Sequence, residues 1–271
     1  MLAPQIRIIE VKRMKTALIT GATSGIGLAF AELLAQQGYG LILHGRNVRK
    51  LSELSASLPN VQLTLVADLS CSDEVTAMIE QLEQVEQPID VAINNAGFGL
   101  YGKHTELKES DISAMLALNV SALTRLSRYF AERMAVQGSG HILNVASTAA
   151  YQPQPYFAAY AATKAYVASF TEAMALEMKS SGVSMTCLSP GRTDTGFFTF
   201  EGKDDAKSGT GTFSAKHRAH PQEIARLGLK AMFAEKLREI PLFENKFYVF
   251  LNRLLPRTTM LSIYERAMKN I

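Results

Sequence analysis

The chain has 271 residues, of which 47% are hydrophobic, and its formal net charge is +3 at pH 7. This length and apolar content are sufficient for one large α/β domain with a full core. Because 28 basic residues are nearly balanced by 25 acidic ones, no single-sign field favours nucleic acid as a partner. The two cysteines, Cys71 and Cys187, fit no metal-ligand or disulfide spacing, so we expect neither a bound metal nor a disulfide framework.

The first residues, MLAPQIRIIEVKR, interrupt their apolar positions with four charged side chains. A secretory signal has an uninterrupted apolar segment, so we expect a cytoplasmic protein. We interpret residues 1–13 as an extension and residues 14–271 as a single domain. No segment of the chain is long and apolar enough to suggest a membrane span.

Short apolar runs alternate along the chain with longer segments of helical periodicity. Helices are expected at about 26–37, after residue 47, from residue 72, and at about 106–135 and 156–181. Near-continuous apolar strands between helices indicate a doubly wound, Rossmann-like α/β fold with a parallel sheet. Ligands of such sheets bind beyond the carboxyl ends of the strands. Strands are expected at 15–20 (KTALIT), 39–44 (YGLILH), 61–67 (VQLTLVA), 89–95 (IDVAINN), 140–147 (GHILNVAS) and 183–190 (VSMTCLSP).

The first strand is followed directly by a glycine-rich segment, TGATSGIG, that opens a helix. Gly21, Gly25 and Gly27 permit a tight turn and the close approach of a pyrophosphate to backbone N–H groups at a helix N-terminus. A glycine-rich turn without any ligand is the alternative.

The end of the second strand bears on which nucleotide is bound. Folds that select NAD carry an acidic residue here, which binds the ribose 2′-hydroxyl. This chain has Gly45 followed by Arg46, and a guanidinium suits the 2′-phosphate of NADP. We therefore expect NADP(H) in preference to NAD(H), with a merely solvated Arg46 as the alternative.

The ends of the other strands carry weaker signals. Asp68, in ADLS, is either a ligand contact or a helix cap, and NNAG, residues 94–97, is equally a turn. In SPGRTDT, residues 189–195, the hydroxyl groups of Thr193 and Thr195 either contact a ligand amide or satisfy their own loop.

Taken together, TGATSGIG, NNAG, Ser147, Tyr160-x-x-x-Lys164 and PGRTDT occur in an order and spacing that resemble the short-chain dehydrogenase/reductase family, from about residue 15 to 195. The resemblance implies hydride transfer between NADP(H) and a carbonyl or alcohol substrate, with Asn119, Ser147, Tyr160 and Lys164 as the catalytic residues. It also implies the residues that bind the cofactor. These are Gly21, Thr23, Ser24, Gly25, Ile26, Gly27, Arg46, Asn47, Asp68, Leu69, Asn95, Ala96, Gly97, Tyr160, Lys164, Pro190, Gly191, Thr193 and Thr195.

The residue types at these positions suit that chemistry. A phenol needs a nearby positive charge to act as an acid or base near neutral pH, and Lys164 lies one helical turn after Tyr160. Ser147 would donate a hydrogen bond to the same substrate oxygen. Asn119 would hold a water that connects Lys164 to solvent, although a polar core residue is the alternative.

Three further tyrosines lie near Tyr160 in the sequence, and none has a cation four residues later. We expect Tyr151 and Tyr156 to line the substrate pocket and Tyr166 to be a packing residue. Aromatic and aliphatic residues around the expected cleft favour an apolar or bulky substrate. They are Phe98–Tyr101, Phe157, Phe197, Phe198 and Phe200.

Two segments near the C-terminus have distinct compositions. Residues 194–220 are expected to form a substrate lid, with a disordered surface loop as the alternative. Residues 243–271 are expected to contain an amphipathic helix that packs on the domain, on a sister subunit or on a membrane surface. The family resemblance implies a homodimer or homotetramer assembled through the helices at 106–135 and 156–181.

Two other functions remain open at this point. One is an NAD-dependent alcohol dehydrogenase. The other is a non-catalytic NADP-binding regulatory protein on the same fold, because fold alone does not dictate function.

Overall fold

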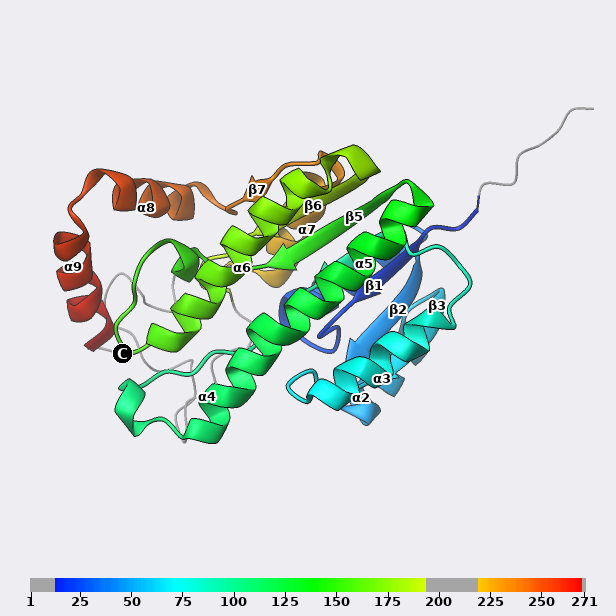
Figure 1. The fold of residues 1–271 in the computed structure, drawn as a ribbon, viewed down its shortest axis with the longest axis horizontal. Helices are drawn as coiled ribbons and strands as arrows, with labels where there is room; N and C mark the ends of the chain where they lie inside the picture. The colour runs from blue at the N-terminus through cyan, green and yellow to red at the C-terminus, as the bar shows by residue number, and fades with distance from the viewer. Residues whose placement is uncertain (1–12, 194–218, 270–271) are drawn as a thin grey trace, which may run out of the picture.

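The computed structural model describes residues 13–193 and 219–269. Within them a sheet of seven parallel strands has the order β3-β2-β1-β4-β5-β6-β7, which confirms the doubly wound fold (Figure 1). Thr195, Phe197, Phe198, Phe200 and most of the expected lid at 194–220 lie outside the described residues, as do residues 1–12. The strands are β1 (Thr16–Ile19), β2 (Gly40–Gly45), β3 (Val61–Val66), β4 (Val91–Asn94), β5 (Gly140–Val145), β6 (Val183–Leu188) and β7 (Arg238–Glu239).

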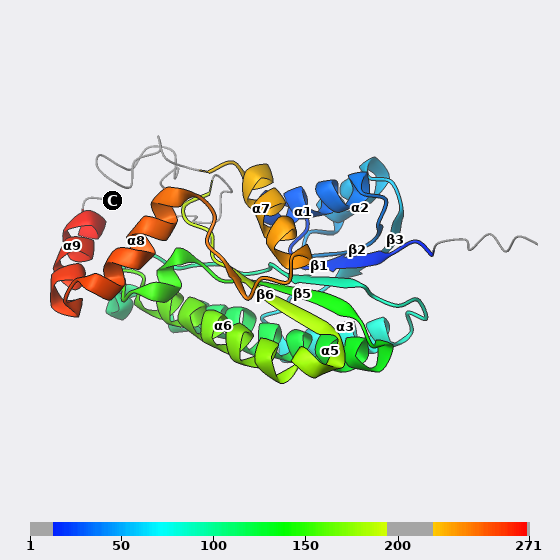
Figure 2. The same cartoon turned by 90° about the horizontal axis from the view of Figure 1, so that it is seen from above.

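Helices cover both faces of the sheet (Figure 2). One face is covered by α1 (Gly25–Gln36), α2 (Val48–Ser57) and α7 (Pro221–Phe233), and the other by α3 (Ser72–Glu83), α5 (Leu123–Gln137) and α6 (Ala158–Glu177). Each face has its own apolar core, in which Phe30 of α1 and Phe130 of α5 are fully buried. The near-continuous apolar strands follow from this burial on both faces.

The helical stretch expected at 106–135 contains a π-helical turn that periodicity did not indicate. It starts with the short 3₁₀ turn η1 (His104–Glu106) and continues as α4 (Glu109–Leu116), a π-turn (Ala117–Ala122) and α5. Asn119 lies in the π-turn. Such turns occur frequently at functional sites.

The chain after residue 219 holds elements that periodicity missed, namely α7 and the two-residue strand β7. The expected amphipathic C-terminal segment is present as two helices, α8 (Phe243–Leu254) and α9 (Arg257–Lys269). Pro256 separates them, because proline has no N–H to continue α8. Among the helices described, none combines the length and apolarity that crossing a bilayer requires.

Candidate active site

The loop after β1 is shaped by its glycines and by hydrogen bonds to the loop after β4. Gly21 and Gly25 have φ angles of 66° and 57°, in the left-handed region that favours glycine. A Cβ atom on Gly27 would lie 2.1 Å from the carbonyl oxygen of Gly21, so any side chain would collide with backbone. Asn95 donates from Nδ2 to the carbonyl oxygens of Thr20 (2.9 Å) and Gly21 (3.3 Å), which ties the two loops together.

The N-terminus of α1 fits the phosphates of a nicotinamide dinucleotide. The side chain of the N-cap residue, Ser24, makes no capping hydrogen bond, and the first turn contains no acidic residue. Its N–H groups and the positive end of the helix dipole are therefore available to an anion. Thr23, Ser24, Gly25, Ile26 and Gly27 would hold the cofactor here.

A buried histidine, which the sequence reading missed, supports this loop. His44 is 2% exposed, and its Nδ1 accepts a hydrogen bond from the N–H of Gly21 (3.3 Å). Its Nε2 therefore carries the proton and donates to the carbonyl oxygen of Ala67 (3.0 Å). Burial lowers the pKa of His44, which agrees with a neutral ring. In the sequence, the position of His44 at the end of the second expected strand is the one feature that could have indicated this role.

Arg46 and Asp68 meet at the ends of β2 and β3. Arg46 is 64% exposed at its side chain and contacts Asp68 at 3.5 Å between Nη1 and Oδ2. Although burial would raise it, the pKa of Asp68 is lowered by hydrogen bonds from Ser70 and by the charge of Arg46. A solvent-accessible guanidinium at this edge of the sheet remains available to a phosphate group.

The side chains of two residues that are expected to bind the cofactor make structural contacts. Asn47 caps α2 by accepting a hydrogen bond from the N–H of Lys50 at 2.9 Å. Leu69 is 3% exposed and packs in the core beneath α3. The buried side chain of Leu69 is thus withdrawn from this edge, whereas Asn47 is exposed there.

Asn119 fixes the turn that follows β4. Its Nδ2 donates to the carbonyl oxygen of Phe98 (2.8 Å) and to Thr163 Oγ1 (3.2 Å), and its Oδ1 accepts from the N–H of Phe98 (3.2 Å). A Cβ atom on Gly97 would lie 3.0 Å from Asn119 Oδ1 and 3.5 Å from Lys164 Nζ. The π-turn thus brings Asn119, Gly97 and Lys164 together. In the loop after β4, the N–H of Ala96 donates to Thr20 Oγ1 at 3.0 Å.

Ser147, Tyr160 and Lys164 converge beside this turn. The hydroxyl groups of Ser147 and Tyr160 are hydrogen-bonded to each other. Lys164 Nζ lies 5.9 Å from the centroid of the Tyr160 ring and donates to the carbonyl oxygen of Val145 at 2.8 Å. Tyr160 and Lys164 come from successive turns of α6, and Ser147 comes from the end of β5.

Burial dominates the protonation of this group. It raises the pKa of Tyr160 to about 12, against the opposing effect of the hydrogen bond with Ser147. It lowers the pKa of Lys164 to about 8. At neutral pH, Tyr160 therefore carries its proton and Lys164 is mostly an ammonium, so a proton donor and a positive charge stand side by side.

The segment after β6 closes the site. The carbonyl oxygen of Pro190 accepts from the N–H of Thr148 at 2.9 Å, which holds the end of β6 against the turn that follows Ser147. Thr193 Oγ1 donates to the carbonyl oxygen of Gly191 at 3.1 Å, so this hydroxyl satisfies its own loop.

Tyr151, which we expect to line the substrate pocket, has contacts that helical spacing does not reveal. Its hydroxyl group contacts Ser189 Oγ at 3.0 Å, and Arg238 from β7 lies over its ring at 5.3 Å. The cation comes from a distant strand, which a count along one helix does not detect. Arg238 in turn forms a bidentate pair with Glu172 at 2.6 and 2.7 Å. Tyr151 therefore anchors the turn after Ser147 to β6 and β7.

The other two tyrosines have different surroundings, since Tyr166 lies on α6 and Tyr156 lies in the loop before it. Tyr166 is partly exposed, stacks on Phe170 and contacts Thr124 Oγ1 through its hydroxyl group, as expected of a packing residue. Tyr156 stacks on Tyr101 with ring centroids 5.8 Å apart. Both belong to an apolar cluster that includes Tyr160, so aromatic rings surround the phenol.

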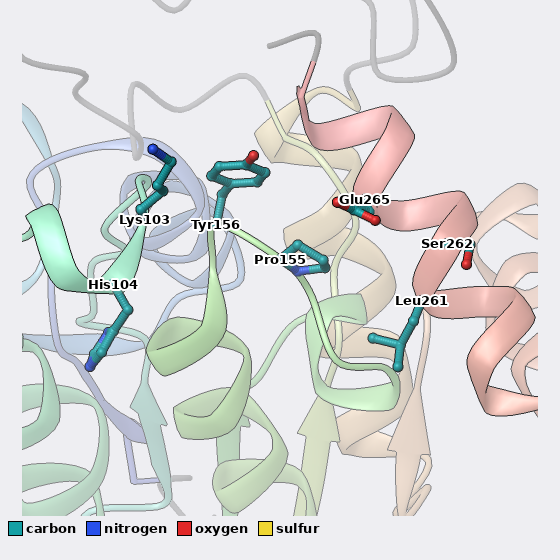
Figure 3. A pocket seen from close by; sticks show the side chains of 7 residues that line it. All are labelled: Lys103, His104, Pro155, Tyr156, Leu261, Ser262 and Glu265. Carbon is teal, nitrogen blue, oxygen red and sulfur yellow. The ribbon is translucent and has the colours of Figure 1, made fainter.

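Tyr156 also lines a cavity of about 500 Å³ between the loop before α6 and helix α9 (Figure 3). Figure 3 shows Lys103 and Tyr156 near each other, with Leu261 and Glu265 extending from α9. Its lining combines apolar and charged side chains and is less uniformly apolar than expected. The lining residues are Lys103, His104, Pro155, Tyr156, Leu261, Ser262 and Glu265.

Comparisons with known proteins agree with this geometry. Residues 15–206 match the family model described as short chain dehydrogenase. An uncharacterized oxidoreductase of Staphylococcus saprophyticus is 32% identical over 80% of this chain and 91% of its own length.

Two solved structures are similar over most of the chain. A short-chain dehydrogenase from Sphingobium yanoikuyae in complex with NADPH is 29% identical, with a TM-score of 0.77 over 89% of this chain and 93% of its own. A bulky-bulky ketone specific alcohol dehydrogenase from Comamonas testosteroni is 27% identical, with a TM-score of 0.73 over 90% and 92%. This chain is therefore an oxidoreductase of the short-chain dehydrogenase/reductase family, whose members bind a nicotinamide cofactor.

Proposed function

We propose that this oxidoreductase reduces the carbonyl group of apolar or bulky substrates with NADPH and oxidises the corresponding alcohols in reverse. The observation that carries the proposal is the grouping of the Ser147 and Tyr160 hydroxyl groups with the Lys164 amine. This group lies at the carboxyl edge of the sheet, beside a glycine loop that leads into an uncapped helix. A non-catalytic binding protein would not need a buried phenol beside a buried amine.

The three side chains have separate roles at the substrate oxygen. Tyr160 donates a proton to the carbonyl oxygen, and the pKa of about 12 keeps it in the donor form at neutral pH. Ser147 donates a hydrogen bond to the same oxygen and fixes its position. The Lys164 ammonium stabilises the phenolate that remains and returns a proton to it. The cofactor, when bound, supplies the hydride that the carbonyl carbon accepts.

Asn119 supports this chemistry by holding the neighbouring backbone. Its amide holds the backbone of Phe98 in place and lies against Gly97, which packs next to Lys164. We propose that it positions this turn, and that the water connecting Lys164 to solvent is held near it.

Two observations support the choice of substrate and cofactor. The aromatic cluster of Tyr101, Tyr156 and Phe157 around Tyr160 favours an apolar or bulky carbonyl, and a similar structure is that of a dehydrogenase specific for bulky ketones. The exposed guanidinium of Arg46 favours NADP(H) over NAD(H), and another similar structure contains NADPH.

We propose that the enzyme assembles as a homodimer or homotetramer through α4–α5 and α6. Exposed apolar side chains on these helices support this assignment, among them Val136 and Leu176. Light scattering coupled to size-exclusion chromatography tests it, because a monomer at micromolar concentration would contradict it.

Replacing Tyr160 by Phe tests the proposed reaction. The purified wild type is first assayed for NADPH oxidation with short polar keto acids and with aliphatic, aromatic and bulky ketones. On the best ketone, Tyr160→Phe should lower kcat by about 10²- to 10⁴-fold, because only the proton donor is removed. Tyr166→Phe removes an exposed hydroxyl group from the same helix and should leave kcat unchanged. Full turnover by Tyr160→Phe would refute the mechanism.

A further inference from the structure

Helix α8 presents a stripe of four apolar side chains to solvent. Phe243, Phe247, Phe250 and Leu254, here called the α8 stripe, follow the spacing i, i+4, i+7 and i+11, which places them on one face. Each is between 48% and 80% exposed. Large exposed apolar patches on otherwise polar proteins mark interaction sites.

The opposite face of α8 is attached to the domain. Val249 is buried, Asn252 donates to Gln152 Oε1 at 3.2 Å, and Asn245 packs against Gly191, where an added Cβ would lie 2.4 Å from its Oδ1. Gln152 directly follows the short turn after Ser147 and is itself buried. The stripe is therefore held outward by contacts that α8 makes with the domain on its other side.

Basic side chains flank the stripe. Lys246 and Arg253 follow Phe243 and Phe250 by three residues each, so both lie on the same edge of the stripe and both are exposed. Lys246 also pairs with Glu239 at 2.9 Å, whereas Arg253 and Arg257 form no ion pair with another residue in the described part of the chain. Residues 243–266 contain four basic side chains and two acidic ones. An apolar aromatic face bordered by cations suits the interface of an anionic bilayer.

A second copy of the chain fits this surface less well. An antiparallel pairing of two stripes about a two-fold axis would bring the Arg253 edges of both copies together. Like charges at that edge would repel, whereas anionic headgroups would neutralise them.

The stripe lies at the end of the molecule where the catalytic group is reached. Figures 1 and 2 show α8 and α9 together beyond the carboxyl ends of the strands. Leu261 of α9 lines the cavity that Tyr156 borders (Figure 3). Tyr156 lies four residues before Tyr160 and packs in the same apolar cluster. A surface bound to α8 would thus lie near this cavity.

We propose that the α8 stripe docks the enzyme on an anionic phospholipid surface, from which an apolar carbonyl substrate enters beside α9. The docking is argued from the exposed face and the cations that border it, whereas the entry of substrate rests on the proposed function.

A tryptophan reporter tests the docking directly. The chain contains no tryptophan, so Phe247→Trp introduces a single indole in the stripe. With vesicles of phosphatidylcholine and phosphatidylglycerol, its emission should shift to the blue and be quenched by brominated lipid. Leu237→Trp, at an exposed apolar position before β7, should show neither change. No shift at position 247, or an equal shift at position 237, would overturn the proposal.

Flotation with the same vesicles measures the contribution of the stripe and its charges. The full-length double variant Phe247→Ser/Phe250→Ser should partition at least roughly tenfold less than wild type, because it loses two apolar side chains from the contact. Arg253→Glu/Arg257→Glu should lose binding to vesicles that contain phosphatidylglycerol, and added salt should weaken the wild type in the same way. The matched control Val66→Ser/Leu237→Ser replaces two exposed apolar residues outside the stripe and should float like wild type.

The outcomes separate docking from catalysis. Turnover of a water-soluble ketone should be the same for wild type and the Phe247→Ser/Phe250→Ser variant, since neither residue belongs to the catalytic group. If wild type fails to float, or if the double variant floats equally well, docking is refuted while the reductase proposal stands. If the double variant instead converts a dimer to a monomer, a second copy is the occupant and the lipid proposal is wrong. Because flotation does not require turnover, an enzyme inactive on every carbonyl would leave the docking result readable.

Discussion

The two halves of the carboxyl edge of the sheet are built from different parts of the chain. The half after β1, β2 and β3 depends on backbone, with Gly21 and Gly25 at positive φ and the N–H groups of α1 uncapped. The half after β4 and β5 depends on side chains, because Asn119, Tyr160 and Lys164 are at most 5% exposed. Substitution of a loop glycine in the first half should therefore alter structure and cofactor binding together. Substitution of the buried amine in the second half should alter chemistry while stability stays equal or improves.

Replacing Lys164 by Met should have the largest effect and sharpen this contrast. The rate of carbonyl reduction should fall by roughly 10²-fold or more, because the phenolate of Tyr160 loses its stabilising charge. The free energy of unfolding should stay equal or rise, because a buried ammonium with a desolvation cost is replaced by an apolar chain of similar length. Enzyme assays and urea denaturation measure the two effects, and Lys179→Met, at an exposed position, is the control.

The pH dependence of stability separates Lys164 from other groups. Burial lowers its pKa from 10.5 to about 8, so the unfolded chain binds more protons than the folded chain between these values. The desolvation cost is present in full below about pH 8 and is relieved as pH rises toward 10.5, so this group makes wild type more stable across that window. Lys164→Met should lack that increment. A variant with the same pH profile as wild type, or with full turnover, would contradict the assignment.

Replacing Gly27 by Ala should have the next largest effect, in the backbone half. The added Cβ would lie 2.1 Å from the carbonyl oxygen of Gly21 and 2.5 Å from Asn95 Nδ2, so the loop must move. We expect a loss of about 1–3 kcal/mol in the free energy of unfolding and roughly tenfold weaker binding of NADPH. Urea denaturation and fluorescence titration with NADPH measure both.

Gly38→Ala is the control for Gly27. Gly38 has a φ of 80°, but no atom lies within 4 Å of an added Cβ. Its replacement should cost about 1–2 kcal/mol of stability from backbone strain without changing cofactor affinity. If Gly27→Ala bound NADPH as tightly as wild type, the backbone account of the first half would be wrong.

Replacing Arg46 by Ala should have the smallest effect, because its side chain is 64% exposed. We expect roughly tenfold weaker binding of NADP with little change for NAD, since only the contact with the 2′-phosphate is lost. Arg49→Ala removes an exposed arginine of the neighbouring helix, which pairs with Glu53, and should change neither dissociation constant. Equal losses of affinity for both cofactors would contradict the proposed contact of Arg46 with the 2′-phosphate and favour an NAD-dependent enzyme.

Local patterns predicted much of the fold and of the site. Each of β1 to β6 is an apolar run whose residues are buried on both faces of the sheet or on one, so periodicity alone located it. The glycine turn before α1 and the spacing of Tyr160 and Lys164 on α6 are short-range features, since φ angles and helical turns act over a few residues.

Contacts between distant segments account for what the sequence reading missed. His44 of β2 supports Gly21, which follows β1, and Arg238 of β7 contacts the ring of Tyr151. Neither contact can be detected from residues that are close together in the sequence. The π-turn that carries Asn119 follows from its hydrogen bonds with Phe98 and Thr163. These partners are brought together only by folding.

The sequence by itself determined the order of the elements, the loop for a dinucleotide and the pair Tyr160 and Lys164, because each depends on residues a few positions apart. Only the tertiary structure decided which faces are covered. It buried Leu69, used Asn47 as a helix cap, and left the aromatic face of α8 exposed beside the cavity. Amphipathic periodicity shows that a helix has an apolar face, but what that face meets depends on how the rest of the chain packs around it.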